Sequence, residues 1–192
     1  MSLRGWQAAL VGLLAGDEAV PAGDDVTAAE AAWLATVRST PGYALTSQVQ
    51  CQWRAFRVRS CLPLTARLLG ARFEPLVAAY VEDRGEPASF FLREAEQFVE
   101  HSRAALAAAA SADDRLAHAD AVTRFELAMT RPHAGAGGGP ELIGFLAPPG
   151  AVLGCLAAGR RPPPPAPRPV AYLRCGAGTC RLATGDELPV SQ

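Results

Sequence analysis

The sequence predicts a mainly α-helical protein that ends in a small β-containing subdomain. Apolar residues recur at helical spacing from near the N-terminus to about residue 130. Glycine- and proline-rich segments then lead to residues 168–185, where side chains alternate as they do in a β-hairpin. We therefore expect an N-terminal bundle of about six or seven helices in 1–132, a Gly/Pro-rich linker with an apolar segment in 133–169, and a hairpin with a tail in 170–192.

The first two predicted helices cover residues 3–15 and about 27–40. The first stops at Gly16, because glycine favours helix ends. The second opens with Thr27, and Glu30 stands three residues later, which is the spacing of a capping box. The Pro41–Gly42 pair that follows is expected to end this second helix.

The third predicted helix, residues 46–60, is expected to be buried on most of its surface. Val49, Trp53 and Phe56 fall at i, i+4 and i+7, and a second apolar stripe lies on another face of the same helix. Two apolar stripes on one helix are typical of a helix with neighbours on several sides.

Four further helices are expected before residue 131. A short helix starts at Pro63 and ends at Gly70, and an i, i+3, i+4, i+7 apolar pattern begins at Phe73. A long helix follows over about 90–110. Ser111, with an aspartate three residues later, is expected to cap a last helix that reaches about residue 130.

The C-terminal part of the sequence lacks the helical periodicity of the first 130 residues. Residues 141–159 are apolar but broken by glycine and proline, which fits short strands or irregular structure, and residues 160–169 form a polyproline spacer. Alternation from Val170 to Cys175, a glycine-rich turn and a return from Cys180 to Thr184 predict a β-hairpin. Because a two-stranded hairpin is marginal on its own, something else must cover it.

Composition and charge exclude several classes of function. Eighteen basic and 19 acidic residues give a net charge of −1, whereas generic nucleic-acid binding needs a large basic excess. No apolar run reaches the length that spans a membrane. The apolar N-terminal stretch is followed by acidic residues, unlike a signal-peptide cleavage site. We expect a cytoplasmic protein with no membrane partner and no nucleic-acid partner.

No catalytic or metal-binding constellation stands out in the sequence. His101 and His118 are expected on polar helix faces and His133 in the linker. The helical carboxylates are expected to be solvated: Glu94, Glu96, Glu100 and Glu126. We therefore expect no catalytic residue, no metal ligand and no cofactor in this chain.

The five cysteines are sparse and odd in number, so they do not form a disulfide framework. Cys175 and Cys180 fit half of a zinc site, a redox pair or a disulfide across the hairpin. In a cytoplasmic protein the expectation is two free thiols.

The segment between Tyr43 and Arg72 contains no acidic residue, and it includes the arginines that we predict to contact a partner protein: Arg54, Arg57, Arg59 and Arg67. Two interpretations remain open. The arginines form a docking surface for an acidic partner, because guanidinium groups bind carboxylates in a bidentate manner, or they form a solvated face that happens to be basic.

Residues 53–103 resemble the N-terminal helical domain of HvfC/BufC-type proteins, and the resemblance extends over about residues 3–130. An aromatic and Arg-rich helix leads to a proline and an "LLG" corner, and an "F..L...Y" helix and a proline-containing break follow. The matching positions are Pro63, Leu68–Gly70, Phe73, Leu76, Tyr80, Pro87, Phe98 and Val99. The segment "TRFELAM", residues 123–129, resembles a later helix of that family.

The resemblance implies a partner protein rather than an enzyme. HvfC/BufC-type proteins, and the more distant MbnC and TglI, work beside TIM-barrel multinuclear non-haem iron oxidases that modify ribosomally made precursor peptides. The helical protein carries no iron, which sits in the partner oxidase. It binds that oxidase and helps to recruit the leader of the precursor peptide, which can add as a strand to a small C-terminal β domain. The family has also been labelled as DNA-binding.

We therefore expect the helical part to bind the oxidase and the hairpin to bind the leader. The predicted peptide-binding residues are Val170, Ala171, Tyr172, Leu173, Arg174, Cys180, Arg181, Leu182 and Ala183. The alternative is a purely structural role, in which Tyr172 and Leu173 pack on the apolar segment or on the helices. The alternatives are a transcriptional regulator that binds DNA through the Arg-rich third helix, and a small enzyme in its own right, for which no residues stand out.

Overall fold

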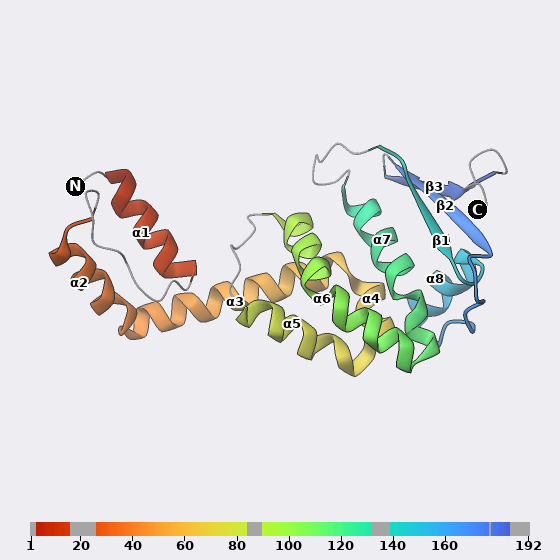
Figure 1. Ribbon diagram of the computed structural model, residues 1–192, viewed down its shortest axis with the longest axis horizontal. Helices are drawn as coiled ribbons and strands as arrows, with labels where there is room; N and C mark the ends of the chain where they lie inside the picture. The colour runs from red at the N-terminus through yellow and green to blue at the C-terminus, as the bar shows by residue number, and fades with distance from the viewer. Residues whose placement is uncertain (1–2, 16–25, 84–89, 132–138, 177, 185–192) are drawn as a thin grey trace. The chain divides into compact units, whose positions relative to one another are not determined.

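The structure, a computed structural model, describes residues 3–15, 26–83, 90–131, 139–176 and 178–184. Within these ranges the chain is mostly helical and carries a small three-stranded antiparallel sheet near the C-terminus, which confirms the predicted fold class (Figure 1). Seven of the described α-helices precede the sheet. None of the helices in the described ranges is long and apolar enough to span a membrane.

The chain forms two compact units, whose division differs from the predicted domain boundaries. Unit 1 comprises Met1–Phe56 and Val81–Pro87, and unit 2 comprises Arg57–Tyr80 and Ala88–Gln192. The predicted boundary at residues 132/133 falls inside unit 2, because the sheet that follows packs against the helix that precedes it. His133 and the tail after residue 184 lie outside the described residues.

Unit 1 is built from α1 (Leu3–Ala15), α2 (Ala28–Arg38) and the first part of α3 (Pro41–Cys61). The predicted capping box at the start of α2 is present: the Thr27 side chain accepts from the Glu30 N–H, and the Glu30 carboxylate accepts from the Thr27 N–H. The Trp6 and Trp33 rings stack at 6.1 Å. The Tyr43 hydroxyl donates to the Leu13 carbonyl at 2.7 Å and so ties α3 to α1.

Helix α3 differs from its prediction in two ways. It begins at Pro41 rather than near residue 46, because proline is well tolerated at the first position of a helix. It is also not buried on most of its surface. Its exposed face presents the large apolar side chains Leu45 (63%), Val49 (42%), Trp53 (52%) and Phe56 (49%), which we call the α3 stripe.

The helices of unit 2 surround an aromatic core. They are α4 (Pro63–Leu69), α5 (Phe73–Glu82, which ends in unit 1), α6 (Phe91–Ala112), the 3-10 helices η1 (Gly70–Arg72) and η2 (Asp114–His118), and α7 (Ala119–Thr130). Phe98 makes edge-to-face contacts with Phe73 at 5.8 Å and with Tyr80 at 5.7 Å. The predicted start of the last helix at Ser111 is replaced by η2, which is capped by the Asp113 side chain.

A third strand and two helices cover the predicted hairpin. Its strands are β1 (Glu141–Phe145), β2 (Ala171–Gly176) and β3 (Thr179–Leu182), in the order β1-β2-β3, and α8 (Pro149–Ala157) follows β1. The broken apolar segment thus supplies a third strand, and α7 and α8 contact the sheet from one side. Gly144 allows β1 to approach closely, since a Cβ there would lie 2.9 Å from the Tyr172 ring.

Two side chains fasten the segment between α8 and β2 to the helices. Arg67 on α4 donates to the Leu156 and Ala157 carbonyls, at 3.1 and 2.6 Å, and so satisfies the C-terminal end of α8. His118 Nε2 lies 2.9 Å from the Pro163 carbonyl. His118 is fully buried, which corrects the expectation of a polar helix face, because the polyproline segment folds back over η2 instead of extending away.

Candidate functional site

β3 forms one edge of the sheet, and no described strand pairs with its outer side. The Ala183 N–H donates to the Tyr172 carbonyl at 2.9 Å, which fixes the pattern of the ladder. Hydrogen-bonded positions alternate with non-hydrogen-bonded ones in an antiparallel pair. The main-chain groups of Arg181 therefore face β2, and those of Cys180 and Leu182 face away from the sheet. We call this outer side of Thr179–Leu182 the β3 edge.

The side chains on the helix-facing side of the sheet are more exposed on β3 than on β1 and β2. Ile143, Leu173 and Leu182 lie side by side in the register and share the face that contacts the helices. Their exposed fractions rise from 0% through 7% to 62%. The apolar row thus runs past the covering helices and ends in a leucine that a further strand would bury.

Cys175 and Cys180 form a disulfide between β2 and β3, which corrects the expectation of two free thiols. The register places the two residues directly opposite each other, with their Cα atoms 4.1 Å apart, in a non-hydrogen-bonded pair, where the side chains lie closest. Cys180 Sγ also lies 3.6 Å from Met129 Sδ on α7. The disulfide therefore holds β3 against β2 beside the β3 edge.

Reduction of this disulfide by dithiothreitol is expected to lower the free energy of unfolding by about 2 kcal/mol, because the bond closes a short loop in the unfolded chain. The measurement is thermal denaturation with and without the reductant. The double variant Cys175→Ser/Cys180→Ser should unfold at the lower temperature and should not respond to dithiothreitol, while Cys155→Ser should behave like the parent chain. Equal midpoints with and without reductant would contradict the prediction.

The predicted peptide-binding residues on the first strand of the hairpin are not available to a guest strand. The Val170 N–H donates to the Phe145 carbonyl at 2.8 Å, and Ala171–Arg174 pair with β1 along their whole length. β1 therefore pairs with the side of β2 that faces away from β3. On the second strand, the main-chain groups of Cys180 and Leu182 face outward and those of Arg181 face β2. The Arg181 guanidinium donates to the Leu182 carbonyl at 3.4 Å.

Three of the predicted partner-binding arginines lie on α3, and all three are buried or paired within the chain. Arg54 is buried. Arg57 Nη1 lies 3.7 Å from a carboxylate oxygen of Glu94. Arg59 makes two hydrogen bonds to Glu74, at 3.0 and 2.5 Å. Arg67, the fourth, is bonded to the end of α8 as described above. The structure thus brings Arg57 and Arg59 to carboxylates, and Arg67 to carbonyls, of the chain itself.

Two of the helical carboxylates are buried, which corrects the expectation that they are solvated. Glu94 is 0% exposed and accepts a 2.6 Å hydrogen bond from the Tyr80 hydroxyl. Glu126 is 5% exposed and accepts from the Leu64 N–H at 2.5 Å, the Thr65 N–H at 2.9 Å and the Thr65 hydroxyl at 2.6 Å. Glu126 on α7 therefore caps the N-terminus of α4, where the preceding residue supplies no side-chain cap.

The Glu126 carboxyl makes stability depend on pH. Burial raises its pKa from the ordinary 4.5 to about 7, although the bonds from Thr65 and Leu64 oppose this shift. The folded state then holds the proton more tightly than the unfolded state, so the stabilisation is complete below about pH 4.5 and is lost as the pH rises through about 7. We expect this group to lower the free energy of unfolding by about 3 kcal/mol over that range.

Urea denaturation at a series of pH values checks this expectation. The Glu126→Gln variant stays neutral at every pH and should lack this contribution, so the difference between the two stability curves should grow in favour of the variant as the pH rises. Parallel curves for the parent chain and the variant would contradict a raised pKa at this site.

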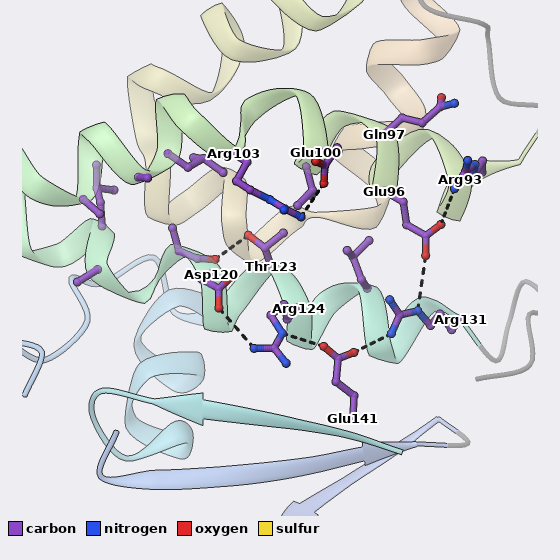
Figure 2. Close-up of a pocket in the computed structure, with 18 residues that line it drawn as sticks. Arg93, Glu96, Gln97, Glu100, Arg103, Asp120, Thr123, Arg124, Arg131 and Glu141 are labelled. Carbon is purple, nitrogen blue, oxygen red and sulfur yellow. Dashed lines mark hydrogen bonds and ion pairs between the residues drawn. The ribbon is translucent and has the colours of Figure 1, made fainter. Parts of the chain in front are cut away.

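A groove of about 730 Å³ lies between α6 and α7 and was not predicted from the sequence (Figure 2). Aliphatic side chains of both helices, such as Val99 and Leu127, line it together with four arginines and four carboxylates: Arg93, Arg103, Arg124, Arg131, Glu96, Glu100, Asp120 and Glu141. All eight charged groups take part in ion pairs with one another. The charge of the groove is therefore compensated within the chain.

The centre of this network fastens the sheet to α7. Arg124 and Arg131 converge on Glu141, with nitrogen–oxygen distances of 2.8 and 2.7 Å (Figure 2). Partial burial would raise the pKa of Glu141, but the hydrogen bonds from the two arginines outweigh it and hold that pKa below its usual value. Arg124 Nη2 also donates to the Leu142 carbonyl at 3.0 Å, so the outer side of β1 is partly occupied. Of the two edge strands, β3 is therefore the one whose outer main-chain groups are more accessible to an added strand.

No cluster of three or more histidine, cysteine or acidic side chains suited to a metal ion occurs in the described ranges. No protein-family model matches the chain, and neither a curated protein nor a solved structure matches it.

Proposed function

We propose that this chain is a non-catalytic partner protein that presents an extended precursor peptide to a separate multinuclear non-haem iron oxidase. In this proposal the leader of the peptide adds to the β3 edge, and the helical part binds the oxidase. The iron belongs to the oxidase, and this chain supplies only binding surfaces.

The observation that carries the proposal is the β3 edge itself. Unpaired main-chain groups at a sheet edge are a template for an added strand, whose backbone bonds supply affinity. No described strand pairs with the outward-facing groups of Cys180 and Leu182, although the Leu182 carbonyl accepts a 3.4 Å hydrogen bond from Arg181 Nη1. Beside these groups an apolar row ends in an exposed leucine. A guest strand would bury that leucine and continue the row.

For the oxidase we propose the α3 stripe in place of the arginines on the same helix. Arg57 and Arg59 are already paired with carboxylates of the chain, so a partner would have to break those pairs. The α3 stripe instead offers Leu45, Val49 and Trp53 on one exposed face, and contiguous exposed apolar side chains of this size mark interaction surfaces. The pairing of the arginines also weakens the alternative of a DNA-binding regulator, which needs an exposed basic face.

Coexpression with the products of the neighbouring genes tests the proposal. The chain should co-purify with a TIM-barrel oxidase, and iron should be found in the complex but not in this chain alone. Leu45→Ser/Trp53→Ser should abolish co-purification, while Phe90→Ser, which also removes an exposed apolar side chain, should not. Circular dichroism checks that each variant is folded. If the neighbouring genes encode no such oxidase, or if this chain alone binds iron, the proposal fails.

A further inference from the structure

We infer that the proline-rich segment of residues 160–169 is a docking site for a partner domain whose groove is lined with aromatic side chains and carries a carboxylate at one end. The inference does not depend on strand addition at the β3 edge. The segment connects α8 to β2, and a hydrogen bond holds it against η2 (Figure 1). Its backbone, its exposed side chains and its charge each point to this kind of partner.

The sequence restricts the backbone of this segment to an extended conformation. Each residue from 161 to 169 is a proline or directly precedes one. A proline ring fixes φ at about −65°, and a residue before proline is kept out of the helical region. Both restrictions favour a polyproline II helix, which has about three residues per turn and no internal hydrogen bonds. Aromatic-lined grooves bind this conformation because it is already formed before binding.

Two hydrogen bonds hold the segment on unit 2. The Pro163 carbonyl is bonded to His118 Nε2 at 2.9 Å, and the Ala166 N–H donates to the Leu146 carbonyl at 2.7 Å. His118 is 0% exposed, and Leu146 directly follows β1, so both anchors belong to the packed part of the fold. The segment is therefore ordered before a partner arrives, which lowers the entropic cost of binding.

The side chains of this segment follow a three-residue period in their exposure. Arg161, Pro164 and Pro167 are exposed, and residues three apart share one edge of a polyproline II helix. Pro162 is buried and Pro165 is half-buried, so a second edge faces the protein. The edge that the solvent reaches thus consists of an arginine followed by two prolines at equal spacing.

The third edge of the segment widens this surface. Pro163 and Ala166 are half-buried, and each directly precedes one of the exposed prolines. The solvent side therefore carries two pairs of neighbouring apolar residues, Pro163–Pro164 and Ala166–Pro167. Two shallow pockets between aromatic rings are the complement of such pairs, whereas a flat or strongly hydrated surface would not cover them.

Arg161 calls for a carboxylate at one end of the partner's groove. Residues 142–185 contain no acidic residue, and the Arg161 guanidinium makes no ion pair within the part of the chain that the structure describes. Arg161 lies at the end of the exposed row, so a carboxylate beside the first pocket would form a charge-assisted hydrogen bond with it. This bond would also fix the direction in which the segment lies in the groove.

Isothermal titration calorimetry tests the inference. The probe is an SH3 domain chosen because it binds the synthetic peptide Arg-Pro-Pro-Pro-Pro-Ala-Pro, and the full chain should bind it at least as tightly as the peptide does. Arg161→Glu should weaken binding about tenfold, since attraction is replaced by repulsion. Pro164→Ala/Pro167→Ala should weaken it at least as much, because two apolar rings and two fixed φ angles are lost.

Two matched variants serve as controls. Arg168→Glu makes the same change of charge at an exposed position outside the row, and Pro75→Ala removes an exposed proline from the first turn of α5. Both should bind within about twofold of the parent chain. Circular dichroism checks that each variant is folded.

Two results would overturn the inference. If the domain binds the synthetic peptide but not the full chain, the fold hides the segment. If Arg168→Glu weakens binding as much as Arg161→Glu, and the double proline variant binds like the parent chain, binding reflects net charge rather than the proline row. Either result leaves strand addition at the β3 edge untouched.

Discussion

Glu126→Ala is expected to lower the free energy of unfolding by about 3 kcal/mol. The carboxyl accepts three hydrogen bonds from Leu64 and Thr65, and its loss leaves two backbone N–H groups and a hydroxyl without that acceptor in a buried place. Each such loss costs about 1 kcal/mol or more. Because the bonds join α7 to the start of α4, the loss weakens a contact between elements that are far apart in the sequence.

Urea denaturation at pH 7 measures this effect. Glu100→Ala is the matched control, since the Glu100 side chain is 68% exposed and pairs with nearby Arg103, and its cost should stay below about 0.5 kcal/mol. Equal midpoints for the two variants would show that Glu126 does not hold α4 in place.

Phe145→Ala is expected to cost about 3 to 4 kcal/mol. Phe145 ends β1, is 0% exposed and is among the largest fully buried side chains of the chain's described part. Its removal deletes buried apolar surface and leaves a cavity that the surrounding side chains fill only in part. The loss falls on the strand that covers the hairpin, so the β3 edge should be disturbed as well.

The same truncation at Phe90, which is 71% exposed, provides the control and should change the free energy of unfolding by less than about 0.5 kcal/mol. Urea denaturation at a fixed pH compares the two. A Phe145→Ala variant as stable as Phe90→Ala would mean that β1 is not packed as described.

The sequence predicted the helices well, because their apolar periodicity is local. The start of α2 is an example, since Thr27 and Glu30 lie within one turn of each other. β1 was left open between a short strand and irregular structure, because it is five residues long, contains a glycine and lies in an apolar segment broken by proline. A short apolar run cannot be distinguished from irregular structure by periodicity alone.

The buried carboxylates and the disulfide were misjudged for different reasons. Glu94 and Glu126 lie on helices with polar faces, and their burial depends on Tyr80 and Thr65, whose positions no local pattern reveals. The disulfide could have been found, since the predicted hairpin already places Cys175 opposite Cys180. The assumption of a reducing compartment outweighed that geometry.

The peptide-binding residues stay a prediction. The second strand of the predicted hairpin forms a sheet edge, and Leu182 is exposed there. The first strand was also predicted to contact the peptide, and its packing on the apolar segment was kept as an alternative. The pairing of β1 with β2 corresponds to that alternative. Two of the arginines predicted to bind a partner, Arg57 and Arg59, pair with Glu94 and Glu74, and these pairs depend on tertiary contacts that no local pattern reveals.

Amide hydrogen exchange at the β3 edge tests the central claim most directly. The Cys180 and Leu182 amides face outward, so they should exchange quickly in the free protein and slowly when an extended, valine-rich synthetic peptide is bound. The Arg181 amide faces β2 and should change little. Protection of Cys180 and Leu182 on binding would support strand addition at this edge. Unchanged exchange at both residues, with protection at Leu142 or Gly144 of β1 instead, would contradict it.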